Sequence, residues 1–199
     1  MVACGALARH VHAVAQRRGW PVDVHPLPPL LHNRPARIAR AVEDAVERLG
    51  AYGAVAVAYA DCGTYGALDD VCTRLGVARL PGAHCYDVFA GQRRVQELLA
   101  EEPGTYLLTD YLAATFERSV VTELGLDRFP ELKPDYFGHY RRAVWLAQEP
   151  TPERRAAAQA AASFMDLPLI VVSVGDGGLE RALAAIIPPP RSSNSASPG

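Results

Sequence analysis

Short apolar runs alternate along the chain with longer segments of helical periodicity. The apolar residues at 38, 42, 46 and 49 have the spacing of one helix face. Residues 54–59 instead form an unbroken apolar run, which is typical of a short strand covered on both faces. The two patterns recur, and they predict helices at 6–18, 35–49, 68–75, 95–101, 112–124, 151–164 and 179–186, and strands at 2–4, 22–25, 54–59, 77–80, 105–109, 143–147 and 169–174.

About seven successive strand–helix units favour a mostly parallel sheet with helices on both faces. We therefore expect an α/β fold, a single doubly wound domain over residues 1–187. The run at 169–174 is the clearest candidate for a buried strand. The first strand follows Met1 so closely that it is expected at a sheet edge, unless the chain begins earlier. Residues 188–199, mainly Pro, Ser and Asn, are expected to be a disordered tail.

Composition and charge exclude some classes of protein. The chain of 199 residues carries 20 Lys and Arg against 22 Asp and Glu, a net charge of −2, without the basic excess of a nucleic-acid binder. No apolar run approaches the roughly 20 residues of a membrane span, and we see no export signal. We expect a cytoplasmic protein whose four cysteines are thiols rather than disulfides.

Three of the four cysteines fall where a predicted strand turns into a helix. Cys4, Cys62 and Cys85 follow the first, third and fourth strands, and two of them precede a glycine. Ligands of parallel sheets bind outside the carboxyl ends of the strands, so these thiols are expected at one edge. Cys72 falls within a predicted helix and is expected in the core.

Three converging thiols suit a soft metal, either zinc or an iron–sulfur cluster. Three cysteine ligands leave a fourth position for water or substrate, as in catalytic metal sites. Two other interpretations remain open at this point. One is a reactive thiol or thiol pair without metal, and the other is small residues filling tight turns.

Further polar and glycine residues cluster at the same predicted edge. His84 and Asp61 are candidate catalytic residues for proton transfer, although Asp61 could equally bond its own turn. The candidates for binding a small-molecule substrate lie in turns or at helix starts, where backbone N–H groups are free. They are His32, Asn33, Gly63, Tyr86, Asp110, Gly177 and Gly178.

Several segments in order resemble an uncharacterised bacterial and archaeal family, the domain of unknown function numbered sixteen thirty-eight. They are residues 3–7, 31–35, 59–64, 81–86, 102–105, 108–110, 136–138 and 177–180. In that family the turn cysteines are part of the pattern, which the resemblance carries onto Cys4, Cys62 and Cys85. The resemblance also implies a link to corrinoid proteins and methyltransferases in one-carbon metabolism. The site is loosely similar to 2-hydroxyacyl-CoA dehydratase subunits, where cysteines from separate turns hold an iron–sulfur cluster.

Three functions follow from these observations. The first is a metal–thiolate enzyme acting on a small polar metabolite. The second is a metal or cofactor carrier for a partner such as a corrinoid or methyltransferase protein. The third is a thiol enzyme without metal, which would need one cysteine far more reactive than the others.

Overall fold

The computed structural model describes residues 1–187, and the predicted disordered tail lies outside this part of the chain. The seven strands in it are all parallel, but they form two sheets. The first sheet has the order β2-β1-β3-β4, from β1 (Val2–Cys4), β2 (His25–Leu27), β3 (Ala56–Ala58) and β4 (Ala78–Arg79). The second has the order β5-β6-β7, from β5 (Thr105–Thr109), β6 (Arg142–Ala147) and β7 (Leu169–Ser173). The α/β class is confirmed, and the structure adds the division of the strands.

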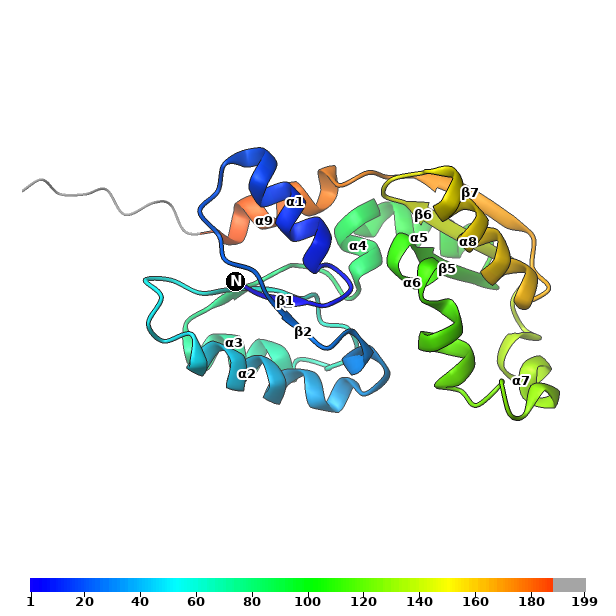
Figure 1. Cartoon of the computed structure of the whole chain (residues 1–199), viewed down its shortest axis with the longest axis horizontal. Helices are drawn as coiled ribbons and strands as arrows, with labels where there is room; N and C mark the ends of the chain where they lie inside the picture. The colour runs from blue at the N-terminus through cyan, green and yellow to red at the C-terminus, as the bar shows by residue number, and fades with distance from the viewer. Residues whose placement is uncertain (188–199) are drawn as a thin grey trace, which may run out of the picture.

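Helices cover both faces of the first sheet (Figure 1). Helices α1 (Ala8–Arg18) and α9 (Gly177–Ile186) lie on one face, and α2 (Ile38–Arg48) and α3 (Ala67–Leu75) lie on the other. Leu179 and Leu183 of α9 are fully buried in the same core as β1 and β3. The chain therefore returns from the second sheet to complete the core of the first.

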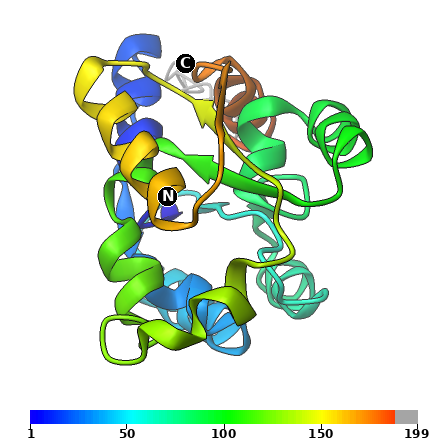
Figure 2. The same cartoon turned by 90° about the vertical axis from the view of Figure 1, so that its right-hand side faces the viewer.

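The second sheet is covered in the same manner, as Figure 2 shows from the side of this sheet. Trp145 of β6 is fully buried with α6 (Asp110–Ala114), the π-helix Glu117–Thr122, α7 (Lys133–Phe137) and α8 (Pro152–Phe164) on one face. Val144 and Leu146, which alternate with it, pack against α4 (Cys85–Ala90) and α5 (Gln92–Glu101) on the other face. This alternation is the period of two expected of a strand.

Helix α4 lies between the two halves of the molecule, in contact with α5, with α9 and with β6. Three short 3₁₀ helices complete the elements, at Pro29–Asn33 (η1), Pro35–Arg37 (η2) and Pro130–Leu132 (η4). Each has a proline in its first turn, where the missing N–H leaves no carbonyl unpaired. None of the helices in residues 1–187 has the length and apolar character needed to cross a bilayer.

The structure corrects three local predictions and adds a helix, α4, that the sequence pattern did not predict. The segment expected as a strand at 22–25 pairs instead at His25–Leu27. The strand expected to be most buried, β7, is an edge strand on which Ile170 is 40% exposed. Conversely, β1 lies between β2 and β3 rather than at an edge. Helix α4 had no counterpart among the predicted elements, because six residues are too few to establish a helical period.

Candidate functional site

Three cysteines lie at the carboxyl ends of strands in the first sheet. Cys4 is the last residue of β1, Cys62 follows β3, and Cys85 begins α4 just after β4. Two backbone hydrogen bonds join the last two turns, from Asp61 N–H to Gly82 O at 3.1 Å and from Cys62 N–H to Ala83 O at 2.7 Å. Cys72 lies in α3 and is buried in the core. All four are free thiols.

The three thiols at this edge interact electrostatically. Cys4 and Cys62 are buried and Cys85 is partly buried. Burial raises the pKa of Cys4, and burial with the neighbouring Cys4 raises the pKa of Cys62 to about 12. Burial, then Cys62 and Cys4, raise the pKa of Cys85 well above its usual value. Each thiol is therefore neutral near pH 7 unless a cation compensates the charge of the thiolate.

Backbone N–H groups near each of the three sulfur atoms partly oppose the effect of burial on the thiol pKa values. Those of Ala6 and Leu7 favour the thiolate of Cys4, that of Cys85 favours the thiolate of Cys62, and that of Tyr86 favours the thiolate of Cys85. Hydrogen bonds to sulfur stabilise thiolate charge and tune metal–thiolate centres. The backbone at this edge is thus arranged for anionic sulfur, although burial keeps the thiols neutral.

Tyr59 is a residue at this edge that sequence analysis missed. Its side chain is fully buried, and its hydroxyl has no hydrogen-bond partner. The hydroxyl lies near Cys4, close enough to favour its thiolate but without hydrogen-bond geometry. Burial and the three neighbouring thiols raise the pKa of Tyr59 so far that the hydroxyl remains a proton donor. The sequence feature that could have identified Tyr59 is its position at the end of a buried apolar strand, two residues before Asp61.

His32 contacts the same group from η1. Its Nδ1 and Nε2 atoms lie 3.6 and 3.9 Å from Cys4 Sγ, and its ring stacks on Tyr59 with centroids 5.7 Å apart. Burial, opposed by a hydrogen bond to Pro29, lowers the pKa of His32, so the ring is neutral. The structure therefore places His32, expected as a substrate-binding residue, against the first cysteine.

Asp61 organises the turn that carries Cys62. Its carboxylate accepts hydrogen bonds from the N–H groups of Gly63, Tyr65 and Gly66 at 3.1–3.2 Å, and from Thr64 Oγ1 at 2.6 Å. Burial alone would raise the pKa of this carboxyl, but these bonds bring it below its usual value. An acceptor so fully engaged suits a positioning residue better than the proton-transfer role predicted from the sequence.

The remaining candidates near the cysteines differ in exposure. His84 precedes α4 and is exposed, with its ring 6.2 Å from that of Tyr86. Tyr86 is partly buried, and burial and the adjacent Cys85 raise its pKa well above the usual value. Gly63 has a φ of 82°, and a β-carbon there would lie 3.4 Å from Pro35. A proton-transfer role for His84 and substrate contacts for Tyr86 and Gly63 stay predictions.

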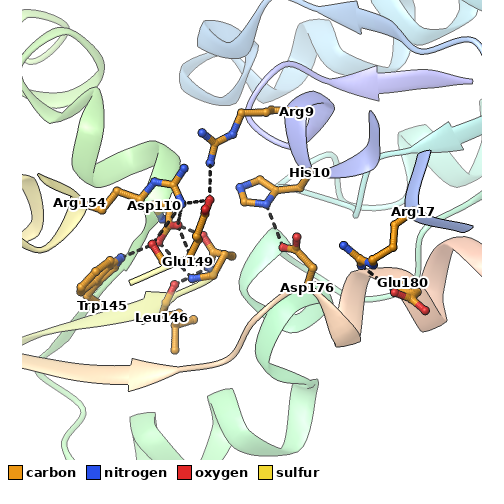
Figure 3. Close-up of polar contacts among 11 residues, drawn as sticks. Arg9, His10, Arg17, Asp110, Trp145, Leu146, Glu149, Arg154, Asp176 and Glu180 are labelled. Atoms are coloured by element: carbon orange, nitrogen blue, oxygen red, sulfur yellow. Dashed lines mark hydrogen bonds and ion pairs between the residues drawn. The ribbon is translucent and has the colours of Figure 1, made fainter. Parts of the chain in front are cut away.

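Asp110 belongs to a second polar cluster, between the two sheets (Figure 3). It is 3% exposed and accepts hydrogen bonds from Trp145 Nε1, from the N–H groups of Gln148 and Glu149, and from Arg154, at 2.9–3.2 Å. Because protein donors already fill both carboxylate oxygens, Asp110 is a structural residue here rather than an open substrate contact. Arg154 and Trp145 were not singled out from the sequence.

Helix α1 extends this second cluster across the molecule. Arg9 lies 3.8 Å from Glu149, and the Nδ1–H of the buried His10 donates to Asp176 at 2.9 Å (Figure 3). Asn33 makes another such link, donating to the carbonyl of Ser119 at 3.0 Å. The contacts of Arg9 and Asn33 join the two halves, so Asn33 has a structural partner, and its predicted contact with a substrate stays a prediction.

The glycine turn before α9 is a packing contact. A β-carbon at Gly178 would lie 2.4 Å from the carbonyl oxygen of Val88 and 2.5 Å from that of Phe89, so glycine lets α9 approach α4. Gly177 has only the end of Arg181 nearby. Because α4 occupies the space beside Gly178, this residue serves helix packing, and the predicted substrate contacts of Gly177 and Gly178 stay predictions.

The donor set at the cysteine edge was tested against a metal ion. Within residues 1–187, no three His, Cys, Asp or Glu side chains stand in an arrangement that could hold one. The chemistry of the donors nevertheless fits a soft cation. It comprises three thiols whose thiolate forms would repel one another, N–H groups near sulfur, a neutral imidazole and an unpartnered buried hydroxyl. Side-chain rotation at the cysteines, between low-energy rotamers, would be needed to complete a site.

One family model matches most of the chain. A family model described as "Protein of unknown function (DUF1638)" matches residues 26–183. The match includes His32, Cys62 and Cys85, while Cys4 lies before it. No curated protein and no solved structure shows a significant match to the chain.

Proposed function

The chain belongs to the DUF1638 family, whose description names no activity, and on that premise we propose a function from the cysteine edge. We propose that Cys4, Cys62 and Cys85 bind zinc or an iron–sulfur cluster, and that the centre acts on a small polar metabolite. The observation that carries the proposal is the convergence of three thiols, two buried and one partly buried, whose thiolate forms would repel one another. A bound cation removes this repulsion and the burial penalty of the thiolates together.

The chain's own residues support such a centre in distinct ways. Asp61 fixes the turn of Cys62, and Tyr59 offers a permanently protonated hydroxyl to a sulfur or to a bound ligand. The exposed His84 at the rim is placed to exchange protons with solvent. When bound, the metal would supply Lewis acidity or thiolate activation. A reducing compartment such as the cytoplasm, where thiols persist, suits this role.

A carrier function is the second candidate, and the rim of the site favours it. Tyr65, three residues after Cys62, is 97% exposed, and His84 beside Cys85 is also exposed. An accessible rim of this kind suits transfer to a partner, for which a corrinoid or methyltransferase protein is our proposal. By contrast, the raised pKa values of all three thiols disfavour a thiol enzyme without metal, which needs a stabilised thiolate.

The test is elemental analysis with an absorption spectrum on protein purified without air. We expect metal in the wild-type chain and its loss in Cys4→Ala, Cys62→Ala and Cys85→Ala, with retention in the control Cys72→Ala. About one zinc per chain without a visible band indicates zinc, and iron with acid-labile sulfide indicates a cluster. Metal-free wild-type protein that also takes up neither zinc nor iron overturns the proposal.

The enzyme and the carrier differ in metal exchange. A catalytic centre is expected to retain its metal against a mild chelator, whereas a carrier is expected to lose it within minutes. The measurement is the rate of metal transfer to a chromophoric chelator, with wild-type protein that has first been shown to contain metal. Rapid transfer contradicts the enzyme and supports the carrier.

A further inference from the structure

Resting on the proposed metal–thiolate centre, we propose that His32 is its fourth ligand, through Nε2. The 3₁₀ helix η1 carries His32 to the edge where β1 ends, and the ring reaches Cys4 Sγ with Nδ1 at 3.6 Å and with Nε2 at 3.9 Å. Within residues 1–187, this is the one contact between a histidine ring and a cysteine thiol that is close enough for a hydrogen bond. The ligand set would then be three cysteines and one histidine, a recognised tetrahedral set for zinc.

The hydrogen bonding of the ring leaves Nε2 available. Nδ1 lies 3.3 Å from the carbonyl oxygen of Pro29, which can only accept, so that bond requires the proton on Nδ1. Nε2 then carries the lone pair, which faces the Cys4 thiol at 3.9 Å and becomes available to a metal ion once that thiol gives up its proton. Metal-binding histidines commonly donate their second ring nitrogen to a backbone carbonyl in this way, which fixes the tautomer and the ring orientation.

Two features of the backbone and core hold the ring in place. A β-carbon at Gly5 would lie 2.4 Å from the carbonyl oxygen of Leu27 and 2.8 Å from Pro29, so glycine lets the Cys4 turn touch the segment leading to His32. The ring of Tyr59 stacks against the imidazole at an interplanar angle of 21°. The unpartnered Tyr59 hydroxyl, fully buried beside these residues, is an independent sign of a missing ligand at this point.

A histidine at the fourth position changes the chemistry expected of the centre. Three cysteines alone leave one position open, whereas a fourth protein ligand closes the coordination shell. Substrate or a transfer partner would then displace the neutral imidazole, the weakest donor of the set, rather than fill a vacant position. His32 would thus govern access to the metal.

The experiment uses Co²⁺ as a spectroscopic probe with the full chain. Tetrahedral Co²⁺ gives intense visible bands, and thiolate ligands add near-ultraviolet charge-transfer bands. We expect His32→Ala to weaken Co²⁺ binding by at least about 10-fold, because loss of a residue that only hydrogen-bonds to a metal ligand already lowers metal affinity by about 10–100-fold. The visible bands are also expected to change. His32→Cys is expected to restore tetrahedral bands and raise the charge-transfer intensity by roughly a third, in line with a fourth thiolate.

Matched variants separate this inference from the proposed function. His84→Ala removes a neighbouring imidazole and is expected to leave the Co²⁺ spectrum unchanged, while Cys62→Ala is expected to abolish it. If Cys62→Ala abolishes binding but His32→Ala keeps the wild-type spectrum and affinity, His32 is not a ligand and the metal proposal stands. If wild-type protein binds none of Co²⁺, zinc and iron, both are overturned. Circular dichroism on every variant confirms that each is folded.

Discussion

Cys62 has a left-handed backbone conformation, with a φ of 51°. Residues other than glycine rarely adopt it, because the β-carbon approaches the following carbonyl at a cost of roughly 1–2 kcal/mol. The hydrogen bond from Cys62 N–H to Ala83 and the carboxylate of Asp61 hold the turn in this state. Tyr65 in the same turn has the same φ, and strain of this kind, which clusters at functional sites, agrees with the proposed use of the Cys62 sulfur.

Gly5 is the residue at which a single methyl group should disturb the site. In Gly5→Ala the added carbon would lie within 3 Å of Leu27 O, Pro29 N and Pro29 Cδ, so η1 must move away from Cys4. We expect a loss of about 1–3 kcal/mol in the free energy of unfolding, measured by urea denaturation, and weaker Co²⁺ binding. Gly50→Ala, where the nearest contact is an ordinary 3.4 Å, is the control. Equal losses of stability and of Co²⁺ affinity in the two variants would contradict the close contact of Gly5 with Leu27 and Pro29.

At the scale of the element, sequence pattern located most helices and strands but not their surroundings. The strand at Thr105–Thr109 was predicted to the residue, and α8 began one residue after its predicted start, where Thr151 caps it. The edge position of β7 was not predictable, because a strand's neighbours depend on contacts distant in sequence. The same limit applies to the site. Three turn cysteines could be read from the chain, whereas Tyr59 and the contact of His32 with Cys4 required tertiary packing.

The turn from Asp61 to Gly66 should confer acid sensitivity. Hydrogen bonds in the folded state hold the pKa of Asp61 below its unfolded value of about 4. This contribution to stability is therefore complete above that value and is lost as the pH falls through the lower, folded pKa. We expect Asp61→Asn to be less stable than wild type at pH 7, and the difference to shrink toward pH 3. Urea unfolding of both proteins at several pH values measures it, and a difference that grows on acidification would contradict the assignment.

At the scale of the whole molecule, two parallel sheets are joined through α4, α9 and a polar network. His10 with Asp176 and Arg9 with Glu149 connect α1 to segments more than 130 positions further along the chain. Asp110 and Arg154 stabilise the second sheet on the other side of these contacts. The cysteine edge belongs to the first sheet, and the second half contacts it through α4, which Cys85 begins, and through Ser119, which accepts a hydrogen bond from Asn33 next to His32.

The packing of α9 against α4 is most easily tested at Gly178. In Gly178→Ala the β-carbon would lie 2.4–2.5 Å from two carbonyl oxygens of α4, which forces α9 off the first core. We expect about 1–3 kcal/mol of destabilisation and a lower melting temperature. Gly177→Ala, one residue earlier and with its nearest contact at 3.6 Å, should be neutral or slightly stabilising. Similar melting temperatures for the two variants would argue against the packing role of Gly178.

The return of α9 to the first sheet has a consequence for synthesis on the ribosome. The second sheet and its helices, apart from α4, are contiguous in the chain, so this half can fold as soon as it emerges. The first sheet emerges earlier, yet its core lacks Leu179 and Leu183 until α9 is translated. Cys4 and Cys62 are therefore made early and enclosed late. During that interval the nascent chain presents unprotected sulfur to whatever metal or oxidant the surroundings contain.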